Sequence, residues 1–155
     1  MYQKILAPLD GSKLAECVFS HVEALAGGCK VKEVVFAQVV VPFRMPTSSD
    51  YALPPQEVAR IDAQTMVEAE RYLKQVQGRI KLEGTSVQTK ILGGSSPAEI
   101  LSDYAVKNGV DLIVIATHGR SGVSRWVWGS VADRILRSAC VPVLMVRAPG
   151  CFPGI

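Results

Sequence analysis

The residues best suited to chemistry in this sequence form a glycine-rich segment in the last third of the chain. Gly119, Gly122 and Gly129 fall within eleven residues, directly after the apolar run 110–116. Because glycine has no side chain, the main chain at these positions can approach a ligand closely and direct several amides at one anion. The segment therefore predicts an anion-binding loop or, alternatively, a structural turn that holds no ligand.

A helix is predicted to begin at the end of this segment. Ser130 stands three residues before Asp133, as an N-cap residue does before an acidic residue at N3. Val131, Ile135 and Leu136 follow at helical spacing. Since a helix N-terminus has unpaired N–H groups and a partial positive charge, it favours phosphate.

Three polar side chains stand near the predicted loop. His118 and Arg120 can contact an anion, or they can bond only to the loop and to water. Asp10 ends the apolar run Lys4–Leu9 and precedes Gly11, so it either caps a turn or contacts a ligand. Neither G-x-G-x-x-G nor G-x-x-x-x-G-K-[ST] occurs, which excludes those dinucleotide and P-loop sites.

These residues must be positioned by alternating strands and helices. Short apolar runs predict five strands, at residues 4–9, 34–41, 87–92, 110–116 and 141–146. Amphipathic stretches predict four helices: the first ends at Gly27-Gly28 and has His21 on its apolar stripe as a core histidine, and the second ends at Gly84.

The third helix is predicted to open at Ser96 with a capping box and to close at Gly109. Pro142 has no amide hydrogen for a sheet, so the fifth strand should begin at it or form a sheet edge.

The alternation of these elements predicts an α/β fold with a single doubly wound, five-stranded parallel sheet and helices on both faces. In the strand order 3-2-1-4-5, the winding reverses between the first and fourth strands, and ligands bind beyond the carboxyl ends at that point. We therefore expect Asp10 and the segment after Ala116 to meet at one edge of the sheet.

Length and composition limit the possible classes of protein. The chain has 155 residues, 48% hydrophobic and 20% charged, and a net charge of +3, so we expect one folded domain. The basic residues are scattered among few aromatic ones, which disfavours a nucleic-acid partner. No metal-like Cys and His spacing, signal-peptide pattern or membrane-length apolar run is found, so a cytoplasmic protein that contacts no membrane is expected.

The whole sequence resembles the universal stress protein family. The resemblance rests on Ala116-Thr117-His118-Gly119, nine further residues, Gly129-Ser130 and residues 141–146, together with residues 4–12 and 94–100. The ATP-binding branch of that family carries G-x-x-G-x9-G-[ST], and this chain departs from the pattern at its first glycine, which is Ala116. The resemblance implies a domain at residues 1–147, a C-terminal tail at 148–155 and a fold like that of the adenine nucleotide alpha-hydrolases.

The resemblance also implies a ligand and its contacts. ATP, with Mg²⁺, would lie with its adenine between Pro8 and Val39 and its ribose or adenine edge at Asp10. The phosphates would meet the main chain around Gly119 and Gly129. The complete set of candidate ligand-binding residues is Pro8, Leu9, Asp10, Val39, Ala116, His118, Gly119, Arg120, Gly122, Gly129, Ser130 and Val131.

Three functions follow from these observations. A regulatory ATP-binding protein that dimerises through its fifth strand is the first. A slow ATP hydrolase or nucleotidyl transferase is the second, although Asp10 and His118 are the only nearby candidates for acid–base work and we assign no catalytic or metal-binding residue. A ligand-free dimeric scaffold is the third, because a methyl group at Ala116 can weaken binding through backbone strain or through crowding of the ligand.

Overall fold

Five strands and four α-helices make up the part of the chain that the structure describes. The computed structural model describes residues 1–44, 53–117 and 130–147, so the tail at 148–155 lies outside it. The strands are β1 (Lys4–Leu9), β2 (Glu33–Val40), β3 (Ser86–Gly93), β4 (Leu112–Ala116) and β5 (Val143–Val146). The helices are α1 (Val18–Cys29), α2 (Pro55–Arg79), α3 (Pro97–Lys107) and α4 (Ser130–Ser138), and a short 3-10 turn, η1 (Ala15–Cys17), precedes α1.

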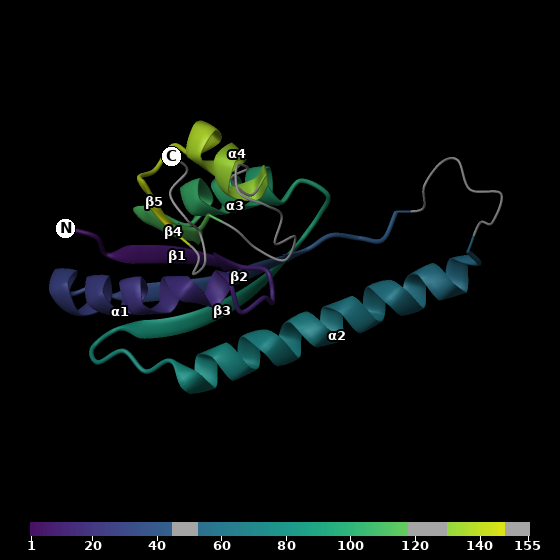
Figure 1. Cartoon of the computed structure of the whole chain (residues 1–155), viewed down its shortest axis with the longest axis horizontal. Helices are drawn as coiled ribbons and strands as arrows, with labels where there is room; N and C mark the ends of the chain where they lie inside the picture. The colour runs from purple at the N-terminus through teal and green to yellow at the C-terminus, as the bar shows by residue number, and fades with distance from the viewer. Residues whose placement is uncertain (45–52, 118–129, 148–155) are drawn as a thin grey trace, which may run out of the picture.

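The strands form one parallel sheet in the order β3-β2-β1-β4-β5 (Figure 1). The predicted doubly wound sheet and its strand order are thereby confirmed. β5 lies at an edge of the sheet and begins directly after Pro142, as the missing amide hydrogen of that residue predicts.

Two apolar layers hold the helices against opposite faces of the sheet (Figure 1). α1 and α2 pack on one face around Phe36, whose ring meets Phe19 edge-on with centroids 5.5 Å apart. α3 and α4 pack on the other face, where Leu101 and Ile135 meet Leu6 and neighbouring sheet residues. Successive strand residues alternate between the layers because their side chains point to opposite faces. Helices on both faces are therefore also confirmed.

The first helix does not end at Gly27-Gly28. α1 passes through both glycines and ends at Cys29, since Lys30 adopts the left-handed conformation (φ 53°) that closes a helix. The expected core histidine is also wrong: the buried stripe of α1 is Val18, Val22 and Ala26, and His21 is exposed beside it. The buried residues of α1 are spaced four apart, and this spacing places Val22, rather than its neighbour His21, against the core.

The ends of the other two helices follow their local geometry. α2 ends at Arg79 rather than Gly84 because Ile80 is extended and buried, whereas Gly84 (φ 71°) serves the turn before β3. α3 starts at Pro97 as predicted, but the side chain of Ser96 makes no capping hydrogen bond, so the capping box is wrong. Gly109 (φ 63°) follows α3 and terminates it as predicted.

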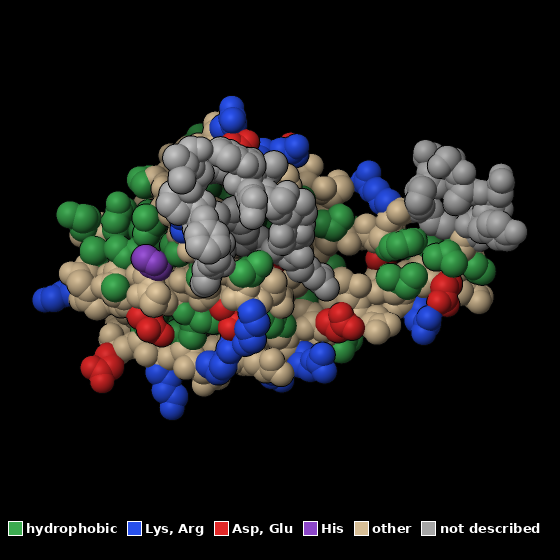
Figure 2. Space-filling view, viewed as in Figure 1, with side chains coloured by type: hydrophobic (Ala, Val, Ile, Leu, Met, Phe, Trp, Pro, Cys, Tyr) green, Lys and Arg blue, Asp and Glu red, His purple; other side chains and the backbone are tan. Residues whose placement is uncertain are grey.

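α2 is longer than the face of the sheet that it covers (Figure 1). Its buried residues, Ala69, Leu73 and Val76, all lie in its C-terminal half. The N-terminal half extends past the sheet beside the segment that leaves β2, where the Phe43 amide donates to Asp62 at 2.8 Å. Apolar side chains gather on this projecting part, and acidic and basic side chains are intermixed elsewhere on the same face (Figure 2).

Within the described ranges, no helix is both long enough and apolar enough to cross a membrane. α2 has the length, with 25 residues, but its sequence is too polar.

Ion pairs connect η1 to α2. The carboxylate of Glu16 accepts hydrogen bonds from the Arg79 guanidinium at 3.0 and 3.3 Å and lies 3.0 Å from the Lys13 ammonium. The Glu16 side chain is only 13% exposed. Burial alone would raise the pKa of Glu16, but the hydrogen bonds and charges of Arg79 and Lys13 outweigh it and lower that pKa below the usual 4.5.

We expect Glu16→Gln to destabilise the protein at neutral pH and to do so less in acid. A carboxyl group whose pKa is lower in the folded state stabilises the fold above its unfolded pKa and loses this contribution as the pH falls through its folded pKa. The difference in unfolding free energy between the wild type and the variant should therefore be constant near neutral pH and shrink below about pH 4.5. Urea denaturation across a pH series measures it.

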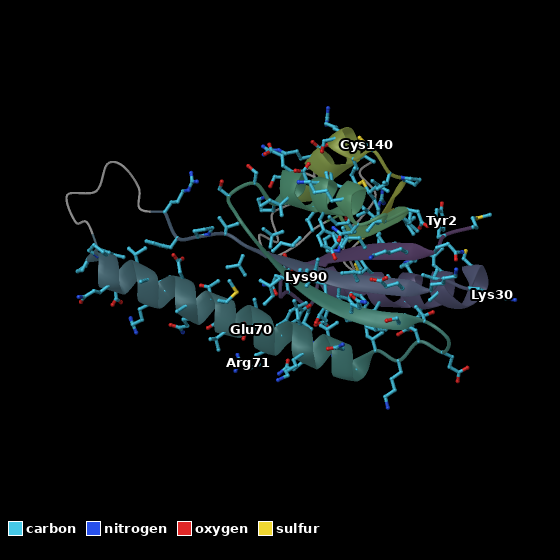
Figure 3. The ribbon with its side chains drawn as sticks, turned by 180° about the vertical axis from the view of Figure 1, so that it is seen from behind. Tyr2, Lys30, Glu70, Arg71, Lys90 and Cys140 are labelled. Atoms are coloured by element: carbon cyan, nitrogen blue, oxygen red, sulfur yellow. The ribbon has the colours of Figure 1, made fainter. Side chains whose placement is uncertain are left out.

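Glu70→Gln supplies the matched control, since Glu70 is an exposed glutamate on α2, the helix that carries Arg79 (Figure 3). This control should show no comparable acid-dependent change. A difference for Glu16→Gln that widened on acidification would contradict a lowered pKa of Glu16 in the folded protein.

Candidate functional site

β1 and β4 separate before they reach their carboxyl ends. β1 pairs with β2 along all six of its residues, but with β4 only at Ile5 and Leu6. β4 meanwhile stays paired with β5 as far as Ala116. Since the winding of the sheet reverses between β1 and β4, the separation lies at the position where open α/β sheets bind ligands.

Two predicted residues from β1 border this separation in different ways. Pro8 is buried and, by strand alternation from Leu6, points to the face covered by α3 and α4. The side chain of Leu9 is 5% exposed and packs in the opposite layer, with η1 and α1. A ligand on the α3 and α4 side would therefore meet Leu9 only through its main chain.

Asp10 holds the turn that follows β1. Its Oδ1 accepts hydrogen bonds from the amide of Ser12 at 3.0 Å and from its hydroxyl at 2.6 Å. The Ser12 hydroxyl in turn accepts from the Ala15 amide at 3.2 Å, at the start of η1. Of the two alternatives for Asp10, the turn role is therefore present, and it fixes the half-buried carboxylate at the end of the strand.

Three further predicted residues lie on the α3 and α4 side of the sheet. Val39 of β2 and Val131 of α4 are both partly buried against the same apolar layer. α4 begins at Ser130, which is exposed, so the predicted helix start is found. The structure thus places Pro8, Val39 and Val131 on one face of the sheet and the N-terminus of α4 beside them.

Ala116 is a regular strand residue. It pairs with Val146, it is 7% exposed, and the positive-φ residues among the described positions do not include it. Its methyl group packs in the layer that contains Leu9 and α1, opposite to Val131. Replacement of glycine by alanine therefore introduces no backbone strain here, and the methyl group points away from the α3 and α4 side.

His118, Gly119, Arg120, Gly122 and Gly129 lie outside the described residues. Their predicted contacts stay predictions from the sequence.

Two residues near this edge were missed by the sequence analysis. Thr117 is 8% exposed and its amide donates to Val146 at 2.8 Å, which extends the β4 pairing by one residue. Gln38 stands opposite Leu9 in the register, and its Oε1 is buried without a hydrogen-bond partner in the described structure. The sequence did contain a signal for each: Thr117 is a polar residue directly after an apolar run, and Gln38 is a polar residue late within one.

The electrostatics of this edge favour an anion. α3 and α4 both begin at the carboxyl side of the sheet, directly downstream of β3 and β4 in the chain, so their positive N-terminal ends face this edge. Among the described residues, no three His, Cys, Asp or Glu side chains are grouped to hold a metal ion. The described part of the site offers backbone amides, the Asp10 carboxylate and apolar walls, which suit binding of a flat ring with an anionic group.

Comparison with known proteins gives a consistent result over nearly the whole chain. The family model "Universal stress protein family" matches residues 1–147. The universal stress protein MJ0531 of Methanocaldococcus jannaschii is 30% identical over 150 residues, which cover 96% of this chain and 84% of that protein.

Solved structures share the fold. The structure of MJ0577 from the same organism has a TM-score of 0.78 and 25% identity, and the match covers 97% of this chain and 99% of that one. A universal stress protein family protein from Arabidopsis thaliana, solved with AMP bound, has a TM-score of 0.66 and 14% identity, with coverage of 96% and 93%.

Proposed function

The chain belongs to the universal stress protein family, and on that premise we propose that it is a cytoplasmic regulatory protein that binds ATP at the carboxyl ends of β1 and β4. The observation that carries the proposal is the early end of pairing between β1 and β4, with α4 beginning at Ser130 beside it. Backbone amides at a helix N-terminus and in a glycine-rich loop are the groups that bind phosphates without requiring a cationic side chain.

Each part of the nucleotide has a proposed partner. Adenine lies between Pro8 and Val39, whose side chains share one face of the sheet. The Asp10 carboxylate, held by Ser12, accepts from a ribose hydroxyl. The phosphates meet amides of the loop that carries Gly119 and of the α4 start.

Ala116 is compatible with this arrangement. Because its methyl group packs on the side of α1, it does not crowd a nucleotide that lies on the side of α3 and α4. The AMP bound by the Arabidopsis relative supports an adenine nucleotide as the class of ligand.

Binding without efficient turnover is the activity that we propose. Mg²⁺ would enter with the triphosphate and be held chiefly by phosphate oxygens, since the described residues include no cluster of metal ligands. Hydrolysis requires a positioned base, and Asp10 already uses Oδ1 to hold its own turn.

We also propose that two copies pair through β5. Among the described residues this strand pairs only with β4, and its Leu144 is 37% exposed. An unpaired apolar edge is covered by self-association in many proteins.

Nucleotide binding is tested first by the ligand that the protein carries. Heat denaturation of freshly purified protein, followed by chromatography of the supernatant, should release ATP. Recovery of ADP would favour turnover of ATP by the protein. If no nucleotide is recovered, titration calorimetry with added ATP decides whether the empty protein binds it. If the purified protein carries no ATP and also does not bind added ATP, the proposal is overturned in favour of a ligand-free dimeric scaffold.

Two substitutions locate the phosphates. Gly119→Val should abolish ATP binding and leave the circular dichroism spectrum unchanged, because a branched side chain obstructs the approach of the main chain. Ser130→Ala should weaken binding about fivefold, which corresponds to a loss of about 1 kcal/mol for a cap or hydroxyl contact. Unchanged affinity of Gly119→Val, measured by calorimetry, would remove the loop from the site.

Ala116→Gly separates stability from binding. Loss of a buried methyl group and the presence of glycine in a strand should lower the unfolding free energy by about 1–2 kcal/mol. ATP affinity should stay within about threefold of the wild type, since the methyl group points away from the nucleotide. Ala37→Gly, at a fully buried alanine of β2, is the matched control for stability. A gain in affinity of about tenfold or more in Ala116→Gly would contradict this placement of the methyl group.

The proposed dimer is tested at Leu144. Leu144→Lys places a charge at the β5 edge and should shift the protein from dimer to monomer in sedimentation velocity. Leu136→Lys is the matched control, because Leu136 is a similarly exposed leucine (45%) on α4. Dissociation of the control to the same extent would place the interface elsewhere.

A further inference from the structure

A groove lies on the other face of the sheet, between the turn after β1 and the C-terminal half of α2. It has a volume of about 440 Å³ and is lined by Gly11, Lys13, Glu16, Tyr72, Gln75 and Arg79. The α2 residues that anchor this half, Leu73 and Val76, belong to the apolar layer shared with α1. The groove is therefore separated by the sheet from Val39, Val131 and the proposed nucleotide site.

One buried polar atom that needs a partner belongs to the lining of the groove, and a second belongs to a residue beside it. In the described part of the chain, the buried side-chain atoms without a hydrogen-bond partner are Gln38 Oε1 and Tyr72 Oη. Tyr72 lines the groove, and Gln38 lies beneath Gly11, since a Cβ added to Gly11 would be 3.7 Å from Gln38 Nε2. Because leaving buried polar atoms unpaired costs free energy, their concentration beside one groove points to a ligand that donates hydrogen bonds.

The surroundings of Tyr72 are negatively charged. Glu16 and Asp10 both lie close enough to act on the Tyr72 hydroxyl, although Glu16 does not reach hydrogen-bonding geometry with it. Burial, followed by these two carboxylates, raises the pKa of Tyr72 above its ordinary value. The floor therefore favours a positively charged donor.

The rim of the groove has the opposite character. The side chain of Lys13 is 81% exposed and that of Arg79 is 46% exposed, and both form ion pairs with Glu16. The ammonium group of Lys13 and the guanidinium group of Arg79 are both suited to pair with a carboxylate. Side chains at the rim are exposed, so they can move aside to admit a ligand to the floor.

We propose that this groove binds a free α-amino acid. The ammonium group donates to Tyr72 Oη and to the Glu16 carboxylate, which both belong to residues that line the groove. The carboxylate pairs with Arg79 and Lys13 at the rim. A zwitterion matches both the acceptor-rich floor and the cationic rim, whereas a simple anion or a simple amine matches only one of them.

The site borders the proposed nucleotide site through one short turn. Asp10 ends β1, and the next residue, Gly11, lines the groove. Gly11 has φ 83°, a conformation that favours glycine, so this tight turn brings the groove lining directly after Asp10. The inference does not require ATP to bind, because none of the groove residues is among the proposed nucleotide contacts.

The experiment is a thermal-shift screen of the full-length protein with each of the twenty standard L-amino acids, followed by titration calorimetry. For the amino acid that gives the largest shift, the amine lacking the carboxylate and the acid lacking the amino group are titrated in parallel. We expect the amino acid to bind at least about tenfold more tightly than either analogue, since each analogue leaves one set of charged hydrogen bonds unmade.

Three variants place the binding in the groove. Tyr72→Phe and Lys13→Gln should each weaken the amino acid about tenfold, and neither removes a core contact. Arg71→Gln, at an exposed arginine of the same helix that does not line the groove (Figure 3), should bind like the wild type. ATP titration of Tyr72→Phe should give the wild-type affinity, which distinguishes failure of this site from failure of the nucleotide site.

The remaining outcomes all overturn the proposal. They are the absence of any shift across the twenty amino acids, equal binding of the amino acid and its acid analogue, and unchanged affinity in both Tyr72→Phe and Lys13→Gln.

Discussion

The structure depends on the way in which the central strand divides its pairing. β1 is bonded to β2 along its whole length but to β4 only at its beginning. The chain winds outward from β1 in both directions, and right-handed crossovers then place α1 and α2 on one face and α3 and α4 on the other. The helix that follows β1 in the chain and the helix that follows β4 therefore lie on opposite faces. The carboxyl edge between these strands is consequently the position at which an open α/β sheet binds ligands.

The turn after β1 is the element on which both proposed sites depend. Asp10 bonds to Ser12, Ser12 bonds to Ala15, and η1 then carries Glu16 toward α2. Glu16 and Arg79 connect this turn to a helix that lies 63 residues away in the sequence. The proposed nucleotide site and the groove thus share a short stretch of chain. If both proposed ligands bind, contact of each with this turn is a simple physical basis for coupling between them.

Local sequence patterns predicted the elements well where the pattern and the tertiary packing agree. The five strands and the edge position of the strand after Pro142 were found in this way. The predicted ends of α1 and α2 failed because glycine was taken as the signal. Lys30 adopts the left-handed conformation instead, and α1 continues through Gly27 and Gly28. Ser96 likewise has the sequence of a cap without the hydrogen bond, since cap formation depends on a side-chain rotamer that spacing does not encode.

By itself the sequence determined the alternation of strands and helices and the order of the strands in the sheet. It also determined the family, through the motif between Ala116 and Ser130. These follow from hydrophobic periodicity, chirality and short motifs, all of which are local or general. Only the tertiary structure decided on which side of the sheet each residue acts. It directed the Ala116 methyl group toward α1, buried the Gln38 Oε1 atom without a hydrogen-bond partner among the described residues, and brought Tyr72 to Glu16. These facts depend on contacts between residues far apart in the chain, which no spacing along the sequence records.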